Sequence, residues 1–520
     1  MIRNPAPPFA GPALTRRALL GAGLSLAGSA LLPGAAWAQE APRRGGRIRV
    51  ASIAASTADT LDPAKGGLST DYVRHYMTYS GLTAYAPDLT PRPALAESLD
   101  SDDQMLWRVA LRRGVQFHDG KELTSADVVF SLLRHKDPAT ASKMKVLAGQ
   151  IAEVQATGTH EVMIRLTGPN ADLPAILAQS HFLIVQDGTK DFSRGIGTGA
   201  FRIKTFEPGV RTVSVRNENY WKPGKGHLDE IELIAIPDEV SRVNALLSGD
   251  VQLVMAVNPR SVRRIRSSPA HALLETRSSL YTNLVMRRDG LPTGNPDFVL
   301  AMKHLLDRDL IRRAMFRNYA TIANDHPIPP WHPYFREDLP QRTFDLDRAK
   351  FHLQRAGLTG IRLPVYASPA AEGSVDMASV LQEYGARVGL KLAVNRMPSD
   401  GYWSTHWMKH PLTFGNTNPR PTADLIFSLF FKSDAPWNES GWQNERFDRL
   451  LMEARGEADQ ARRKQLYGEM QGIVHEECGI GIPVFITLID GHDVRLKGLE
   501  PVALGGFMGY AFAEHVWWDA

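Results

Sequence analysis

The stretch Trp107-Arg-Val-Ala-Leu-Arg-Arg-Gly-Val-Gln-Phe-His-Asp-Gly-Lys-Glu-Leu-Thr-Ser-Ala-Asp-Val-Val-Phe-Ser-Leu-Leu133 holds the signals of a strand and a helix in succession. Its first residues alternate between large apolar and polar or small side chains, which is typical of a half-buried strand. Arg113-Gly114 ends this alternation. Thr124-Ser-Ala-Asp127 is an acidic variant of the capping box that starts helices, and apolar residues then recur at helical spacing. The stretch therefore predicts a strand followed by a helix.

The same succession continues along the whole chain. Alternating strands are expected near 45–51 and 162–166, and amphipathic helices are expected to follow Pro296 and Asp345. Further helical spacing covers 377–384 and a late pair over 447–473. Interleaved strands and helices predict an α/β architecture with more than one sheet. A chain of 520 residues is too long for one hydrophobic core, so two or more domains or one large bilobal unit are expected.

The first 38 residues have the three-part pattern of a secretory signal peptide. Arg3, Arg16 and Arg17 precede an uncharged stretch from Ala18 to Leu32, and Ala36-Trp-Ala38 supplies a cleavage pattern. Thr15-Arg-Arg-Ala-Leu-Leu20 resembles the twin-arginine export signal. A general secretory leader and an N-terminal membrane anchor are the alternatives. No later stretch reaches about 18 uncharged apolar residues, so we expect an exported, soluble periplasmic protein with no direct membrane anchor.

The net charge of the chain says little about its partners. The chain has 60 Lys and Arg residues against 56 Asp and Glu residues. Without the three arginines of the signal peptide, 57 basic residues face 56 acidic ones. A nearly neutral mature chain gives no argument for a nucleic-acid partner or an anionic membrane. The single cysteine, Cys478, excludes an internal disulfide and a cysteine-based metal cluster.

Aromatic and polar residues gather between 402 and 442, where four of the ten tryptophans lie within forty residues. Rigid aromatic walls with a few converging polar groups are typical of small-molecule pockets. The alternative is a well-packed core with incidental surface polar groups. The candidate ligand contacts are Tyr402, Trp407 and Trp437 as apolar walls, and Asn416, Asn418, Arg420 and Asp424 as polar groups.

Signals of catalysis are weak. His406 and His410 are four residues apart and are weak candidates for a metal site, but no acid in their segment completes a metalloprotease pattern. Gly195-Ile-Gly-Thr-Gly199 lacks the residues of a phosphate loop and precedes a strand, so a structural turn is expected. No nucleophile set is evident. We therefore predict no catalytic residues, no cofactor and no enzymatic activity.

Several blocks, in order along the mature chain, resemble the extracytoplasmic solute-binding proteins of ABC importers, in the family 5 class that carries oligopeptides, dipeptides and nickel chelates. The block Arg112-x-Gly-Val-x-Phe-His-Asp-Gly120 is highly specific. The other blocks include Leu61-Asp-Pro63, Tyr79-Ser-Gly-Leu82, Gly197-Thr-Gly-Ala-Phe201, Arg216-Asn-x-Asn-Tyr-Trp221, Ala245-Leu-x-Ser-Gly-Asp250 and Asn444-x-x-Phe-Asp-x-Leu-Leu451.

The resemblance implies a bilobal periplasmic binding protein of class II, the large three-subdomain type, which closes on its ligand by hinge motion. Lobe one would span 39–285, with a subdomain at about 90–195, and lobe two would span 286–486. Residues 487–520 would return to lobe one. The resemblance also implies the function, which is to capture a solute and deliver it to the permease and ATPase subunits of the importer.

One departure from the family pattern concerns the ligand. Peptide-binding members commonly hold the ligand's amino terminus with an Asp in a loop that corresponds to Phe414–Phe427 here, where Asn416 or Asn418 takes the acidic position. A neutral amide cannot neutralise an ammonium group, whereas Arg420 favours a carboxylate or phosphate. The expected ligand is a peptide or a peptide-like or opine-like molecule. The alternatives are a nickel or haem receptor of the same fold that uses His406 and His410, and an exported metal-dependent hydrolase.

Overall fold

Short alternating segments form the strands of the largest sheet. In β1 (Arg47–Ser52), Ile48 and Val50 are buried, and the strand pairs in parallel with β10 (Glu230–Ala235). The computed structural model describes residues 41–519, and the chain from Pro42 onwards clusters into one compact unit. The predicted signal peptide, residues 1–38, with its twin-arginine pattern, lies outside the described residues.

Within residues 41–519 this sheet has 12 strands. Its main path runs through β15 (Lys391–Arg396), β14 (Arg362–Ala367), β16 (Leu412–Thr417), β12 (His271–Met286), β18 (Val484–Asp493), β11 (Leu253–Val254), β1, β10, β9 (Arg211–Arg216) and β8 (Phe201–Glu207). Two further strands pair off this path, β13 (Ala320–Ile322) with β18 and β17 (Ile480–Gly481) with β12.

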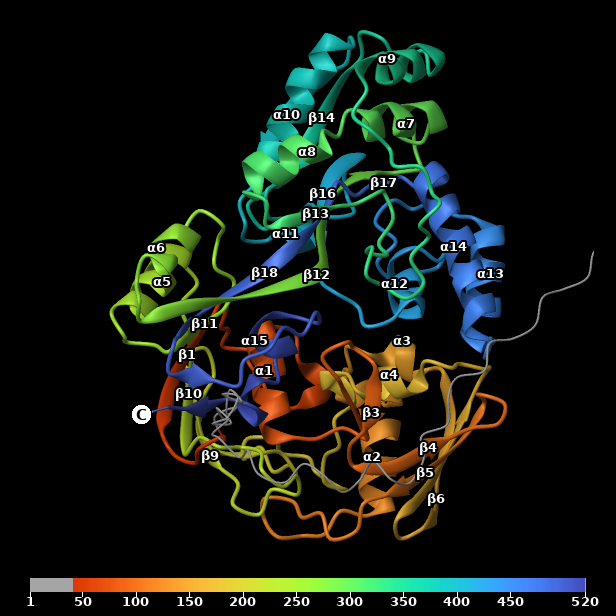
Figure 1. Ribbon diagram of the computed structural model, residues 1–520. Helices are drawn as coiled ribbons and strands as arrows, with labels where there is room; N and C mark the ends of the chain where they lie inside the picture. Colours follow the sequence, from red (N-terminus) through yellow and green to blue (C-terminus); the bar gives the residue numbers. More distant parts are fainter. Residues whose placement is uncertain (1–40, 520) are drawn as a thin grey trace, which may run out of the picture. The chain divides into compact units, whose positions relative to one another are not determined.

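The two halves of this sheet are joined by β12 and β18, which lie side by side (Figure 1). The first part of β12 pairs antiparallel with β18, from His271 opposite Asp493 to Leu280 opposite Ile486. The last part of β12, Tyr281–Met286, pairs with β16 instead. One strand therefore belongs to both halves, and its partner changes at Tyr281.

The stretch 107–133 forms the predicted strand and helix. β5 (Leu106–Leu111) lies in a separate antiparallel sheet of order β4 (Ala96–Asp100), β5, β7 (Glu161–Leu166) and β6 (Ile151–Gly158). At the start of α2 (Ser125–Leu133), the carboxylate of Asp127 accepts a hydrogen bond from the backbone N–H of Thr124 at 2.8 Å. This contact confirms the acidic capping box.

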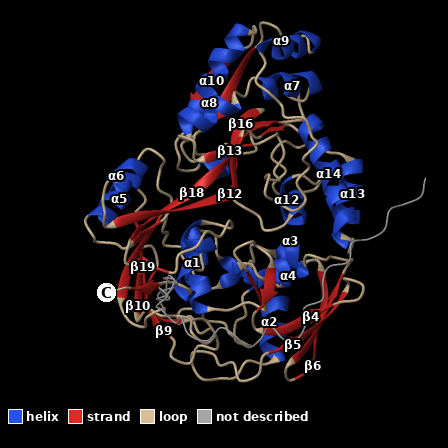
Figure 2. Cartoon of the chain, in the orientation of Figure 1, coloured by secondary structure: helices blue, strands red, loops and turns tan. Residues whose placement is uncertain are grey.

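Helices flank the strands throughout the described chain (Figure 2). The predicted helices are confirmed, and Asp345 caps α9 by accepting the Arg348 backbone N–H at 2.8 Å. None of the helices within residues 41–519 combines the length and the apolar character needed to cross a bilayer. The longer helices are α1 (Ser69–Thr78), α5 (Glu239–Leu247), α7 (Pro296–His304), α9 (Leu346–Arg355), α10 (Ser374–Arg387), α12 (Ala423–Phe430), α13 (Glu445–Gly456) and α14 (Gln460–Glu477).

The remaining strands and α-helices are short. They are β2 (Thr83–Tyr85), β3 (Pro91–Pro93), β19 (Leu496–Lys497), β20 (Trp517–Trp518), α3 (Lys145–Ala148), α4 (Leu173–Leu177), α6 (Val262–Arg266), α8 (Arg308–Leu310), α11 (Tyr402–Thr405) and α15 (Gly506–Gly509).

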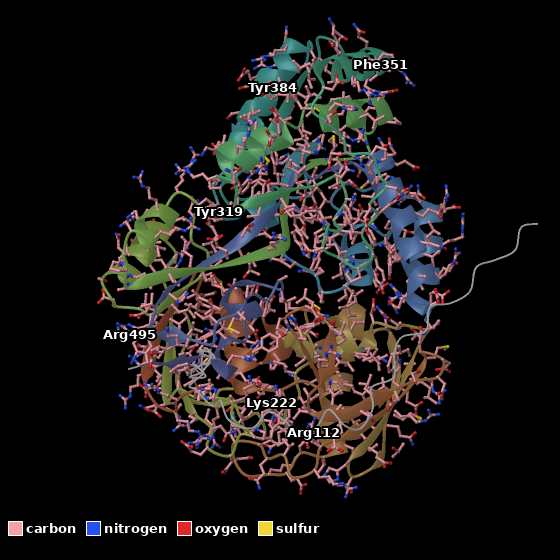
Figure 3. The ribbon with its side chains drawn as sticks, viewed as in Figure 1. Arg112, Lys222, Tyr319, Phe351, Tyr384 and Arg495 are labelled. Carbon is pink, nitrogen blue, oxygen red and sulfur yellow. The ribbon has the colours of Figure 1, made fainter. Side chains whose placement is uncertain are left out.

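One hydrophobic core connects the four-stranded sheet with α12, α13 and α14. At this junction Arg463 pairs with Asp172 at 3.1 Å, and the backbone N–H of Ala171 donates to the Arg455 carbonyl at 3.0 Å. The four-stranded sheet is also tied to the turn after β9. Arg112 and Lys222, labelled in Figure 3, both lie against the ring of Trp221, at 5.6 and 5.1 Å from its centroid.

Candidate functional site

A cavity of about 810 Å³ lies beside the two strands that join the halves of the sheet. One wall is the stretch Ile486–Asp490 of β18, and another is Asn416–Arg420 at the end of β16. Further lining comes from the segment before α1, the stretch Met255–Pro259 and the turn at Gly505–Gly506. A cavity of this size is typical of small-molecule sites. We call it the main cavity.

Aromatic pairs form much of the wall of the main cavity. The rings of Trp403 and Trp407 lie 5.8 Å apart, and those of Phe430 and Trp437 lie 5.2 Å apart. Two of the three predicted apolar walls, Trp407 and Trp437, therefore line the cavity.

A third pair completes the aromatic lining. The rings of Tyr72 and Tyr510 lie 5.4 Å apart. No pattern in the sequence indicates this pair, because the two residues lie near opposite ends of the chain.

Three of the four predicted polar residues also line the main cavity. They are Asn416, Asn418 and Arg420. The side-chain amide of Asn416 donates to the hydroxyl oxygen of Thr282, its register partner on β12, at 3.0 Å. Asn418 is exposed to the cavity. The end of β16 and the loop after it thus place two amides and a guanidinium along one wall.

Arg420 has no acidic partner within residues 41–519. Its guanidinium lies over the rings of Phe430 and Trp437, at 5.4 and 5.8 Å from their centroids. Its nearest hydrogen bonds go to the carbonyl oxygens of Asn418 and Pro419, at 3.2 and 3.0 Å. Burial lowers the pKa of Arg420, and only neighbouring tyrosine hydroxyls oppose this shift. A cation that lies over aromatic rings, with no acidic partner in the described chain, is suited to an anionic ligand group.

A second cavity of about 830 Å³ shares Asn418 and Arg420 with the first. The proline-rich loop 327–334 contributes Trp331 and Tyr334 to its lining, and Asp172 lies in the same wall. The guanidinium of Arg420 therefore lies where both cavities can reach it, so a ligand bound there has room to extend in two directions.

Glu439 supports Trp407 from behind the cavity wall. Its carboxylate accepts hydrogen bonds from the indole N–H of Trp407 and from the side-chain amide of Asn283, both at 2.6 Å. Burial raises the pKa of Glu439 to about 7. Gly415 lies directly against this carboxylate, and a Cβ atom at that position would overlap it. Sequence reasoning missed Glu439, because a single acid carries no local pattern.

The other two predicted site residues, Tyr402 and Asp424, line neither cavity. Tyr402 is fully buried, and its hydroxyl donates to the carbonyl oxygen of Phe414 at 2.8 Å. Asp424 lies in the first turn of α12, where its carboxylate accepts from Arg455 at 2.9 Å. Both residues hold the neighbouring backbone elements in place.

The candidate metal ligands lie outside both cavities. His406 Nδ1 and His410 Nε2 are 3.0 Å apart, within hydrogen-bond distance, and the His410 ring stacks on Tyr366 at 3.6 Å. In the part of the chain that the structure describes, no three His, Cys, Asp or Glu side chains are grouped so that they could hold a metal ion.

The fold and the cavity together define a class of protein, the solute receptors that enclose a small ligand. The family model "Bacterial extracellular solute-binding proteins, family 5 Middle" matches residues 90–439. The chain belongs to this family. The identification from sequence, a family 5 solute-binding protein of an ABC importer, is thereby confirmed.

Similar proteins support this assignment over most of the chain. Heme-binding protein A of Haemophilus influenzae is 26% identical over 451 residues, which cover 79% of this chain and 81% of that protein. Glutathione-binding protein GsiB of Escherichia coli strain K12 is 25% identical over 470 residues, covering 86% and 91%.

The solved structures extend the comparison to the fold. The ABC transporter-associated periplasmic binding protein DppA of Helicobacter pylori, solved with the peptide STSA, has a TM-score of 0.80 at 23% identity. The match covers 92% of this chain and 99% of that one. The predicted fold class, an α/β bilobal periplasmic binding protein, is confirmed.

Proposed function

We propose that this protein binds a peptide or peptide-like solute with an anionic group and delivers it to the permease of an ABC importer. The observation that carries the proposal is the guanidinium of Arg420, which faces two cavities without an acidic partner in the described chain. In this proposal the anionic group binds Arg420, Trp407 and Trp437 contact the apolar part of the ligand, and Asn416 and Asn418 donate or accept hydrogen bonds. The protein binds its ligand and performs no covalent chemistry.

The arrangement of the strands supports a hinged receptor. The proposed lobes are residues 39–285 with 487–520, and residues 286–486. β12 and β18 are the strands shared by the two halves of the sheet, and the proposed crossings near 283–286 and 487–491 lie on them. Closure around the ligand would bring the aromatic walls and Arg420 onto it. The proposed location is the periplasm, after removal of the signal peptide.

The names of the relatives support a peptide-like ligand but do not identify a particular molecule. Their printed names include a glutathione-binding protein and a dipeptide-binding protein as well as a heme-binding protein. A metal-carrying receptor would rely on His406 and His410, but these rings lie outside both cavities and face each other. Arg420, which has no acidic partner among residues 41–519, therefore favours an anionic organic solute over a metal chelate bound by the two histidines.

The proposal can be tested on protein purified from the periplasm of a bacterial host. Small molecules released by denaturing the protein would be identified by mass spectrometry and then titrated back by calorimetry. We expect one molecule of a peptide or peptide-like acid per protein. Stoichiometric metal, turnover of an ester or peptide substrate, or failure to bind any member of a dipeptide mixture would contradict the proposal.

A further inference from the structure

Five charged side chains line the main cavity, and three of them are satisfied by the protein itself. Arg242 donates from its guanidinium to the carbonyl oxygens of Met255 and Ala256, at 2.8 and 2.9 Å, and to two further carbonyl oxygens. Glu239 accepts from the backbone N–H of Asn258 at 2.9 Å. These groups tie together the backbone around the cavity, so they are not free for a ligand.

Asp490 is satisfied in the same way. Its two carboxylate oxygens accept backbone N–H groups, from Ala256 at 3.3 Å and from Phe507 at 2.5 Å. Burial raises the pKa of Asp490 to about 7. This side chain fixes the turn at α15 against β18. The remaining charged groups of the cavity are Arg420 and Glu372.

Glu372 has no hydrogen bond or ion pair with any residue between 41 and 519. It lies between β14 and α10, next to the cap residue Gly373, and lines the cavity together with Pro369 and Ala370. Glu372 is half-buried in this wall, and burial raises its pKa. A carboxylate held in such a place is costly unless a positive group meets it.

We propose that Glu372 binds the positively charged nitrogen of the ligand, an ammonium or guanidinium group, while Arg420 binds the anionic group. This inference rests on the proposed function of the main cavity as the ligand site. It also accounts for the neutral loop after β16, because the acid that neutralises the ligand's amine comes from the segment before α10. The solute class that fits both residues is zwitterionic, such as a peptide with free termini.

If Glu372 had only a structural role, replacing it would change the stability of α10 and leave the preference for ligands unchanged. An acid near the amino terminus of α10 would stabilise that helix through its dipole. Asp376, in the first turn of the same helix, shares this role but does not line the main cavity. Asp376 lies 3.6 Å from Arg260, and both side chains are well exposed. Asp376→Asn is therefore a matched control, since it removes one charge from the same helix end.

The test uses the mature protein and two defined pools of probes. The first pool contains synthetic dipeptides and tripeptides with free amino termini, and the second contains the same peptides with acetylated amino termini. Each pool is incubated with the wild type, Glu372→Gln and Asp376→Asn, and the retained peptides are quantified by mass spectrometry. Thermal unfolding of each variant reports on its fold.

The wild type and Asp376→Asn are expected to retain the free-amine peptides over their acetylated forms by about 10- to 100-fold, the range for a charge-assisted hydrogen bond. In Glu372→Gln this preference should fall to about twofold or less, with the acetylated peptides retained as in the wild type. An unchanged preference in Glu372→Gln would overturn this inference alone. So would equal retention of both pools by the wild type. Retention of neither pool would overturn the proposed function, and this inference with it.

Discussion

At the scale of single residues, the binding cavity depends on side chains that lie behind its walls. Trp407 faces the cavity, but its indole N–H is held by Glu439, which also holds the amide of Asn283. Glu439 is 4% exposed and has no basic partner within the described chain. Its two hydrogen bonds join the α11 segment to β12, so the orientation of one cavity wall depends on a buried carboxyl.

Glu439→Ala is expected to lower the free energy of unfolding by about 2–4 kcal/mol, because it leaves two buried donors without an acceptor. Urea unfolding of the ligand-free protein at pH 7 would measure this. The control is Glu383→Ala on α10, which removes an exposed acid paired with Arg387 and should change stability by less than about 0.5 kcal/mol. Equal unfolding midpoints for the two variants would show that Glu439 does not support Trp407.

The binding region could be predicted from the sequence, but the residues that line the cavity could not be distinguished from those that pack behind them. Trp407, Trp437 and Arg420 line the cavity as predicted, whereas Tyr402 and Asp424, in the same region, face inward. The sequence shows which residue is aromatic or acidic, but it does not show where the side chain points. Whether the side chain lines the cavity or packs in the core depends on that direction. Glu372 was not predicted, because its isolation appears only when the surrounding chain is folded.

At the scale of elements, the glycine cluster 195–199 is a close-packed turn, as predicted. His118 donates its backbone N–H to the Gly197 carbonyl at 2.8 Å, and the Gly199 N–H donates to the Thr78 carbonyl at 2.9 Å. The turn lies so close to the end of α1 that a Cβ atom at Gly199 would overlap the carbonyl oxygen of Met77. The glycines serve close backbone packing in this turn.

Gly199→Ala should therefore lower the free energy of unfolding by about 1–3 kcal/mol, the usual cost of overpacking. Calorimetric or urea unfolding would measure the change. Gly168→Ala is the matched control, since a Cβ atom at Gly168 meets no atom within 4 Å. If Gly199→Ala proved as stable as Gly168→Ala, the close approach of this turn to α1 would be refuted.

Individual helices were easier to predict from the sequence than the pairing of distant strands. Capping residues and apolar spacing predicted α2, α7, α9 and α10, because a helix is determined by neighbours along the chain. The change of partner of β12 at Tyr281 joins residues more than a hundred positions apart, and periodicity within one strand carries no information about it. The resemblance to a family supplied what the local pattern could not.

At the scale of the whole molecule, buried histidines determine how stability depends on pH. Six histidines have their pKa lowered to about 3 or 4, chiefly by burial, and they are His75, His135, His181, His326, His332 and His515. Between about pH 4 and the usual histidine pKa near 6.5, the unfolded chain binds more protons at these positions than the folded protein does. Acidification through this window therefore favours unfolding.

Four acids whose pKa is raised by burial act in the opposite direction, and they are Glu372, Asp424, Glu439 and Asp490. The pKa values of Glu439 and Asp490 are raised to about 7, so these groups lower the stability of the folded protein as pH rises from about 4 to 7. The six histidines outnumber these four acids, so the histidines determine the sign of the pH dependence. The urea midpoint of the ligand-free protein should thus be lower at pH 5 than at pH 7, and a higher midpoint at pH 5 would contradict this assignment of buried neutral histidines.

The guanidinium of Arg420 is proposed to bind the anionic group of a solute in the main cavity. Calorimetric titration of the wild type and Arg420→Ala with the co-purifying solute tests it most directly. The exposed Arg113→Ala serves as the control for loss of a positive charge. We predict that Arg420→Ala weakens binding by about 10- to 100-fold, with Arg113→Ala unchanged. Equal affinity of Arg420→Ala and the wild type would show that Arg420 does not bind the solute.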